Sequence, residues 1–295
     1  MTYAAAIWTS GFMGGKTLIF TWIDSLLYGL FSGLTDILPI SAPAHKVLLL
    51  KFFGVRQTPA LMELLIHVAV FAALYYSTQS HMIRINRARA LARVPKKKRR
   101  RPLDLRSLMD WRMMKTIAVP AILGLYLYQY TRSMGNNLLL IALFLFINGV
   151  ILYVPQYFPA SNKDSRTLSR IEGLLMGLGG MVSILPGISA VGAAVSIGSV
   201  AGVEKKFALT MALVMNMVLN IGFIVYDVLA IVNGGLGALS FGILLRYILT
   251  AAVAFGGTFA AIRIMGYMSE KHGYAAFGIY CWGLAMFTFV LNLIA

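Results

Sequence analysis

The chain has 295 residues, of which 59% are hydrophobic and 12% are charged, and its formal net charge is +16. Apolar stretches of about 18 or more residues are long enough to cross the hydrocarbon core of a bilayer. The composition therefore excludes a large soluble domain and predicts a single all-α integral membrane domain over residues 1–295. The single cysteine, Cys281, excludes an internal disulfide.

The first apolar region, residues 17–55, is interrupted by the stretch SGLTDILPISAPAH at 32–45, which contains two prolines, Asp36 and His45. Proline breaks a helix, and irregular backbone at membrane depth is tolerated only where it is buried in protein or lines a wet cavity. We therefore expect a re-entrant helix–loop–helix hairpin in this region. An ordinary helix kinked at proline is the alternative.

Six further segments are apolar enough to cross the membrane as single helices. They are 61–80, 116–132, 138–155, 207–232, 239–262 and 275–294. The loop at 81–115 contains the run KKKRRR, and half of the 26 basic residues lie between Arg84 and Lys115. Such a run can indicate nucleic-acid binding, but in so apolar a chain it indicates a cytoplasmic loop. The loop charges thus predict a cytoplasmic 84–115 loop, anionic lipids bound there, and an external C-terminus.

The second interrupted region, residues 169–203, repeats the first. GGMVSILPGISA at 179–190 matches SGLTDILPISA at 32–42, with Gly187 as one extra residue. Each copy is followed by three expected crossings, which predicts an inverted-topology repeat with halves at about 17–155 and 169–295. The two hairpins should enter from opposite faces, and their loops at 39–42 and 186–190 should approach within roughly 10 Å, the spacing of packed helices.

Ionisable side chains inside a membrane are costly, so those of the first hairpin are candidate functional residues. Ser32 and Asp36 are four residues apart and share a helix face, and His45 is expected to fold back toward Asp36. An Asp–His pair near hydroxyls can hold a divalent ion, relay protons, or activate water for attack on phosphorus. The structural alternative is that Asp36 caps a helix and His45 packs at an interface.

Three other features have chemical potential. Ser189 and the small residues after it open a helix, whose free backbone N–H groups would suit an anion such as phosphate. Glu63 and His67 form an i,i+4 pair that either extends a polar cavity or caps a span. Asp227 and Arg246 flank one predicted outer loop, and we expect them to pair with each other.

These motifs resemble those of the bacterial undecaprenyl-diphosphate phosphatase family of the bacitracin-resistance type. The family's first motif, E-G-x-T-E-x-L-P-x-S-S-x-G-H, is similar to SGLTDILPISAPAH, and its second, P-G-x-S-R-S-G-x-T, is similar to PGISAVGAA at 186–194. The stretches at 61–74 and 255–283 also resemble the family's patterns. The resemblance implies removal of the terminal phosphate from a C55 polyprenyl diphosphate, which recycles the lipid carrier of peptidoglycan synthesis. It also implies the bacterial cytoplasmic (inner) membrane as location and a divalent cation, Mg or Ca, as cofactor.

The matching positions imply roles for individual residues. Asp36, His45 and Ser41 would be catalytic, and Asp36 would also bind the metal. The substrate-binding positions would be Ser32, Lys46, Gly187, Ser189 and Gly192.

The chain also departs from the family pattern. Ser32 stands in place of the first motif Glu, and Ala190 in place of the second motif Arg. Lys46 is the candidate for supplying the lost positive charge. Two functions therefore stay open: a polyprenyl-diphosphate phosphatase with a reduced site, and a non-catalytic paralogue that binds or translocates a polyprenyl phosphate or similar amphiphilic anion.

Overall fold

The computed structural model describes residues 20–55, 57–159, 162–236, 239–271 and 273–294, so the expected start of the first repeat at 17–19 lies outside the described residues. Within these ranges the chain is helical, and the extended backbone pairs only in one isolated bridge between Lys163 and Val203. The α-helices are α2 (Trp22–Ile37), α3 (Ala42–Phe53), α4 (Ala60–Arg93), α5 (Leu105–Thr131), α6 (Leu138–Tyr153), α7 (Arg170–Met181), α8 (Ala190–Val200), α9 (Lys205–Gly234), α10 (Phe241–Lys271) and α11 (Ala275–Ile294).

The predicted all-α membrane fold is confirmed. Five described helices are long and apolar enough to cross a membrane, namely α4, α6, α9, α10 and α11. The sixth expected span, 116–132, falls at the end of α5, which has 27 residues but is not among these five. The most enclosed span is α9, with 61% of its apolar window buried, against 22–39% for the other four. Polar side chains on α9 therefore face other helices more than lipid.

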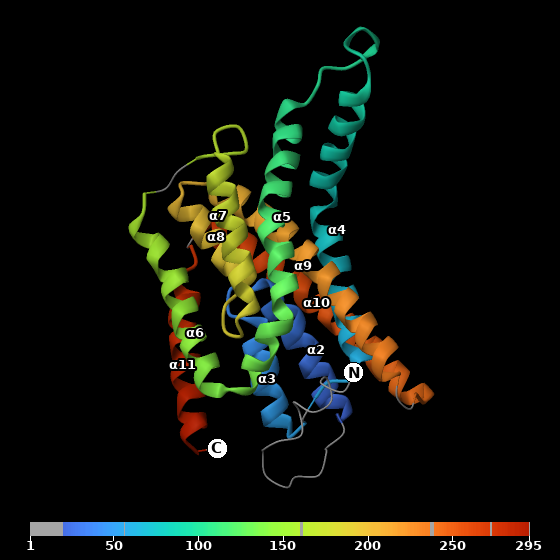
Figure 1. Cartoon of the computed structure of the whole chain (residues 1–295), viewed down its shortest axis with the longest axis vertical. Helices are drawn as coiled ribbons and strands as arrows, with labels where there is room; N and C mark the ends of the chain where they lie inside the picture. The colour runs from blue at the N-terminus through green and yellow to red at the C-terminus, as the bar shows by residue number, and fades with distance from the viewer. Residues whose placement is uncertain (1–19, 56, 160–161, 237–238, 272, 295) are drawn as a thin grey trace.

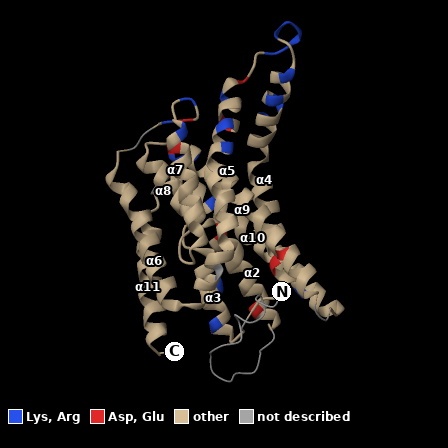
Figure 2. Ribbon diagram, in the orientation of Figure 1, with Lys and Arg blue, Asp and Glu red and all other residues tan. Residues whose placement is uncertain are grey.

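The basic segment forms a projection at one end of the molecule. Helix α4 has 34 residues, so it is about 51 Å long and exceeds the roughly 30 Å hydrocarbon core of a bilayer. The upper ends of α4 and α5 extend past the other helices (Figure 1). Lys and Arg residues concentrate at this end, and the C-terminal end of α11 lies at the opposite end (Figure 2).

Both interrupted regions form helical hairpins, α2–α3 and α7–α8. Each hairpin starts with a capping box, in which the N-cap hydroxyl accepts the backbone N–H three residues on and the carboxylate there accepts in return. The boxes are formed by Thr21 with Asp24 and by Ser169 with Glu172. Hairpin α2–α3 lies nearer the end with the C-terminus, and α7–α8 lies nearer the basic end (Figure 1).

Packing between the halves follows the repeat. Helix α2 packs against α10, and α7 packs against α5, so the first helix of each half contacts the fourth helix of the other. The helices α4 and α9, and likewise α6 and α11, pair across the halves. Small residues allow the close approach: a Cβ at Gly33 would overlap the backbone of Ala254 in α10, and one at Gly177 would overlap the Ile117 carbonyl in α5. The contacts are thus reciprocal between the two expected halves, and the repeat boundaries stay a prediction.

Candidate functional site

The loops that interrupt the two hairpins meet in the interior. The Ser189 hydroxyl donates to the Leu38 carbonyl at 3.4 Å. Asn148 of α6, which is fully buried, joins the loops further: its Nδ2 donates to the Pro39 carbonyl at 3.0 Å and its Oδ1 accepts the Ser189 N–H at 3.0 Å. The prediction that the loops approach within roughly 10 Å is confirmed. Asn148 itself was not expected from the sequence.

The backbone at the two loops differs. Ser41 has φ +70°, the only positive φ at a non-glycine residue in the described part of the chain. In the second loop the unusual conformation belongs to Gly187, with φ +139°, while Ser189 has an ordinary extended φ of −95° and caps α8 by accepting the Gly192 N–H at 3.2 Å. Ser41 is fully buried, and its Oγ has no hydrogen-bond partner among the described residues. A strained residue with an unused hydroxyl is a feature that active sites often contain.

Asp36, at the end of α2, is bound to helix α9. Its Oδ2 accepts the side-chain amide of Asn216 at 2.6 Å and that of Asn220 at 3.2 Å. Both amides donate to the same oxygen, and Oδ1 accepts no hydrogen bond from the described residues. Two buried oxygens near this carboxylate also lack partners in that part of the chain, namely Ser32 Oγ and Asn220 Oδ1. The site therefore offers several oxygen atoms that are free to contact water or a ligand.

His45 does not fold back to Asp36, and that expectation was wrong. Its Nδ1 lies 2.8 Å from the Ser41 carbonyl, and its Nε2 lies 2.8 Å from the Tyr280 hydroxyl of α11. A carbonyl can only accept, so Nδ1 donates, and Nε2 of the neutral ring accepts the tyrosine proton. The two rings are nearly parallel, at 7°. Because α3 starts directly after the Ser41 turn, its first turn directs His45 toward α11.

Lys46 and Glu63 form an ion pair in the interior. Their Nζ and Oε2 atoms are 2.7 Å apart, and their side chains are only 19% and 14% exposed. Tyr28 donates its hydroxyl to the other Glu63 oxygen at 2.5 Å, and the Lys46 ammonium lies 5.9 Å from the centre of the Tyr28 ring. Of the two alternatives for Glu63, the structure supports extension of the polar cluster.

The expected pairing of Asp227 with Arg246 was also wrong. Asp227 Oδ2 lies 2.6 Å from His67 Nδ1 on α4, whereas Arg246 donates to the Phe20 carbonyl. The reason is the packing of the halves: α9 faces α4, and α10 faces α2, so the two side chains are directed to different neighbours. His67 and Asp227 thus form a second close acid–base pair, which joins α4 to α9, whereas Lys46 and Glu63 join α3 to α4.

The second hairpin contributes packing and backbone contacts. A Cβ at Gly192 would lie 2.7 Å from the Pro39 Cβ, and one at Gly187 would lie 2.5 Å from the Phe144 Cβ. The Ser189 N–H is taken by Asn148, and the Ser189 hydroxyl accepts the Gly192 N–H. These three residues therefore bring the two loops together, and two of the N–H groups at the start of α8, those of Ser189 and Gly192, already have protein partners.

A preformed divalent metal site does not fit the residues present. No group of three His, Cys, Asp or Glu side chains in the described ranges is placed to hold a metal ion. Asp36 accepts two amides, and Glu63 is neutralised by Lys46. The divalent cation implied by the resemblance stays a prediction, and no chemical step below depends on it.

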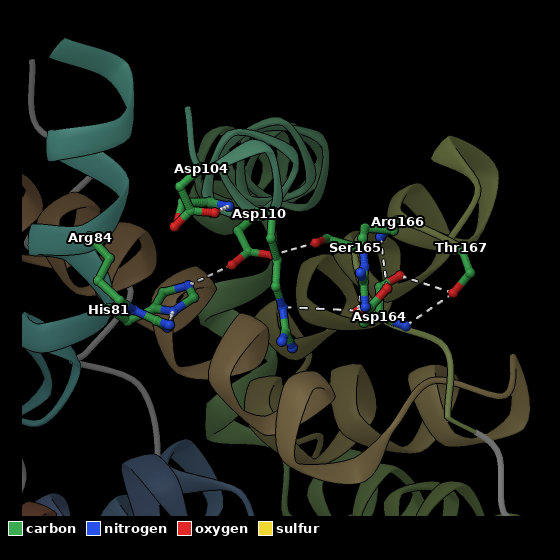
Figure 3. A network of polar contacts seen from close by, with 10 residues as sticks. His81, Arg84, Asp104, Asp110, Asp164, Ser165, Arg166 and Thr167 are labelled. Carbon is green, nitrogen blue, oxygen red and sulfur yellow. Dashed lines mark hydrogen bonds and ion pairs between the residues drawn. The ribbon is translucent and has the colours of Figure 1, made fainter. Parts of the chain in front are cut away.

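A separate polar network ties the basic end together (Figure 3). Asp110 of α5 accepts the Ser165 hydroxyl and lies 3.8 Å from His81 Nε2 on α4. Next to it, the hydrogen-bonded Arg166 guanidinium holds the pKa of Asp164 below its ordinary value. The network joins α4 and α5 to the segment that leads into α7, so it fixes the start of the second hairpin.

The fold and the site define the class of the protein: a multi-pass, all-α membrane protein with ionisable side chains enclosed between its helices. The chain matches the family "Bacitracin resistance protein BacA" over residues 25–287. Because this match spans most of its length, the chain belongs to that family.

Its relatives cover the same extent. The chain is 28% identical over 276 residues to the undecaprenyl-diphosphatase of Methanobrevibacter smithii, which covers 91% of this chain and 96% of the relative. It is 28% identical over 270 residues to the protein of the same name from Nocardioides sp., with the same two coverages. It is 26% identical over 265 residues to that of Streptococcus sanguinis, covering 88% of this chain and 92% of the relative.

Proposed function

We propose that this protein is a polyprenyl-diphosphate phosphatase, which releases inorganic phosphate from undecaprenyl diphosphate and so recycles the lipid carrier of cell-wall synthesis. The names of its relatives support this substrate. The observation that supports the chemistry is that Asp36 and the enclosed Lys46–Glu63 ion pair lie on either side of the first loop, which meets the second loop in the interior. Ionisable residues in such a place are retained at a cost, which favours a functional role.

In the proposed reaction, water attacks the terminal phosphorus, the bond to the bridging oxygen breaks, and that oxygen leaves on the polyprenyl phosphate. Asp36 Oδ1 would accept a proton from the attacking water, because Oδ2 is held by two amides. In its protonated form, His45 would donate its Nε2 proton to the Tyr280 oxygen while the Tyr280 hydroxyl proton passes to the leaving oxygen, which returns the ring to the neutral state described above. His45 is 6% exposed and Tyr280 is 46% exposed, so Tyr280 provides the route from the buried imidazole to a bound lipid. Ser41 would contact the phosphate with its unused hydroxyl.

Lys46 would take the place of the family's missing Arg. Its ammonium can exchange the Glu63 carboxylate for a phosphoryl oxygen and stabilise the charge of the transition state. A lysine is a compact point charge and lacks the two-pronged geometry of arginine. Loss of one preorganised donor typically lowers the rate by about 10²–10³, so we expect slower turnover than in relatives that have both the motif Glu and Arg.

The orientation in the membrane is part of the proposal. The basic projection of α4 and α5 would face the cytoplasm and contact anionic lipid headgroups, and the C-terminus would be external, in the cytoplasmic membrane of a bacterium. A cysteine substituted for Lys98 should then be protected from an impermeant thiol reagent in intact cells and react after lysis. Reaction in intact cells would reverse the assignment.

The deciding experiment is phosphate release from undecaprenyl diphosphate by the purified protein, with added Mg²⁺ or Ca²⁺ and with a chelator. We expect release above a no-enzyme control. If release stays at background while polyprenyl phosphate still binds, the non-catalytic alternative replaces the phosphatase. Loss of release in chelator alone would establish the cation requirement.

The relay through Tyr280 has its own test. Tyr280→Phe keeps the ring that stacks on His45 and removes the hydroxyl, so it should lower kcat by about 10²-fold, the usual scale for general acid–base catalysis, and alter the pH profile. Tyr267→Phe on α10 is the matched control and should leave both unchanged. An unaltered pH profile in an active Tyr280→Phe protein would remove Tyr280 from the mechanism.

A further inference from the structure

A surface pocket at the basic end of the molecule is separate from the site described above. It has a volume of about 180 Å³ and lies between the upper part of α4 and the segment that leads into α5. Its polar lining comes from Arg84, Arg87, Arg101 and Asp104, and apolar lining is contributed by Ala88 among others. A single buried water needs roughly 10–15 Å³ on the same measure. The pocket is more than ten times larger than that, so it has room for a phosphate group.

The charges that line this pocket are not balanced. Three guanidinium groups face one carboxylate, and Asp104 already accepts the backbone N–H and the hydroxyl of Ser107 at 3.0 and 2.6 Å. Arg84 donates one N–H to His81 at 2.9 Å (Figure 3). Arg87 and Arg101 make no hydrogen bond or ion pair with any described residue. Like charges gathered around a hollow repel one another, and an anion between them would relieve that repulsion.

We propose that this pocket binds the phosphate group of an anionic phospholipid, with Arg84, Arg87 and Arg101 as its ligands. Arginine presents a planar fork of N–H donors that matches phosphate oxygens two at a time. The length of α4 allows contact with a headgroup: a helix that enters the hydrocarbon core at Ala60 would leave it before Arg84, because the 24 residues between them span about 36 Å and the core is roughly 30 Å thick. The apolar lining can contact the glycerol and upper acyl region. This binding does not depend on the phosphatase activity proposed above.

The proposal can be tested by native mass spectrometry of the detergent-solubilised full chain. The probes are phosphatidylglycerol, phosphatidylcholine and inorganic phosphate. We expect phosphatidylglycerol to bind about tenfold or more tightly than phosphatidylcholine, because both lipids offer the same phosphate but the choline cation brings a positive charge that the three arginines repel. The triple variant Arg84→Gln, Arg87→Gln, Arg101→Gln should lose this preference.

The matched control is the triple variant Lys96→Gln, Lys97→Gln, Lys98→Gln, since these exposed lysines at the loop tip carry the same three charges and do not line the pocket. It should keep the preference. Equal losses in the two triple variants would mean diffuse attraction and would overturn the site, as would full binding by the arginine variant. Arginine-dependent binding of inorganic phosphate, with no preference between the lipids, would overturn the lipid as its source. The unfolding temperature of each variant checks that the chain is folded, and if the triple arginine variant is not folded, the single variants Arg84→Gln, Arg87→Gln and Arg101→Gln replace it.

Discussion

The two hairpins have the same plan and different turns, and the difference comes from one glycine. The second loop has the extra Gly187, which adopts φ +139° and leaves Ser189 free to cap α8 in an ordinary conformation. The first loop lacks that residue, and Ser41 itself takes φ +70° without capping α3. Glycine adopts positive φ at little cost, whereas other residues store strain there. The shorter loop therefore places the strain on the residue whose carbonyl also holds His45.

The hairpins also differ in the ionisable side chains near their breaks. The first contains Asp36, His45 and Lys46 around its break, whereas residues 182–200 of the second contain no ionisable side chain. The two hairpins thus share one plan, and the ionisable side chains around the breaks belong to the first hairpin alone. An asymmetric site in a symmetric frame predicts unequal effects of equivalent substitutions.

The largest expected effect is on turnover. Asp36→Asn removes the charge and keeps the size, and His45→Ala removes the proton carrier, so each should lower phosphate release by about 10²-fold or more. Glu172→Gln neutralises a carboxylate in the second hairpin and should leave turnover unchanged. The steady-state rate of phosphate release is measured for the three variants. Similar losses of rate in all three would show that the site is not confined to the first hairpin.

Asn148 tests the junction of the hairpins. Asn148→Ala leaves the Ser189 N–H buried without a partner and the Pro39 carbonyl with only the weak Cys281 thiol donor, and an unsatisfied buried group costs about 1–3 kcal/mol. We expect a large drop in the unfolding temperature in detergent. Asn137→Ala removes only the cap of α6, worth about 1 kcal/mol, and is the control. A smaller effect at Asn148 than at Asn137 would mean that the loops are held together by other contacts.

The glycine contacts test the symmetry of the frame. Gly33→Ala and Gly177→Ala each place a methyl group against the backbone of a helix from the other half, and overpacking of this kind costs about 1–3 kcal/mol. Gly256→Ala on α10 has no neighbour within reach of the new Cβ and should be slightly stabilising, because alanine favours a helix over glycine. Thermal unfolding should show two similar losses at Gly33 and Gly177 and no loss at Gly256. A loss at only one of the two sites would contradict the reciprocal packing.

The smallest expected effects are on the free energy of unfolding, and they should have opposite signs at the equivalent serines Ser41 and Ser189. Ser41→Gly relieves a strained φ and should raise the free energy of unfolding by roughly 1 kcal/mol, while turnover falls if the hydroxyl contacts phosphate. Ser189→Ala removes a helix cap and should lower that free energy by about 1 kcal/mol. Chemical denaturation of the two variants measures both. Destabilisation by Ser41→Gly would show that its hydroxyl has a structural partner.

The fold could largely be predicted because hydrophobic length and proline breaks are local signals. The spans and both interrupted regions follow from them, and so does the meeting of the loops, through the repeat of Leu38–Pro39 at Leu185–Pro186. The capping boxes were missed, although Thr21 and Ser169 with their acidic partners three residues on can be found in the sequence.

The site was predicted less well because its partners are distant in sequence. Asp36 and His45 were identified as candidates, but the sequence does not show which helix faces Asn216, Asn220 or Tyr280, although two asparagines four residues apart in an apolar span are visible in it. The pairing of Asp227 with His67 depends on which helices face each other, and sequence proximity to Arg246 suggested the wrong partner. Pairing across the halves is a property of the assembled fold.

The position of Cys281 gives the protein a built-in reporter. The only thiol of the chain is fully buried, and its sulfur lies 3.2 Å from the Asn148 amide and 3.8 Å from the Pro39 carbonyl. An alkylating reagent can reach it only when α11 separates from the first loop. The rate of labelling of the unmodified chain therefore measures how often the junction opens, and a ligand that binds there should slow the reaction without any engineered probe.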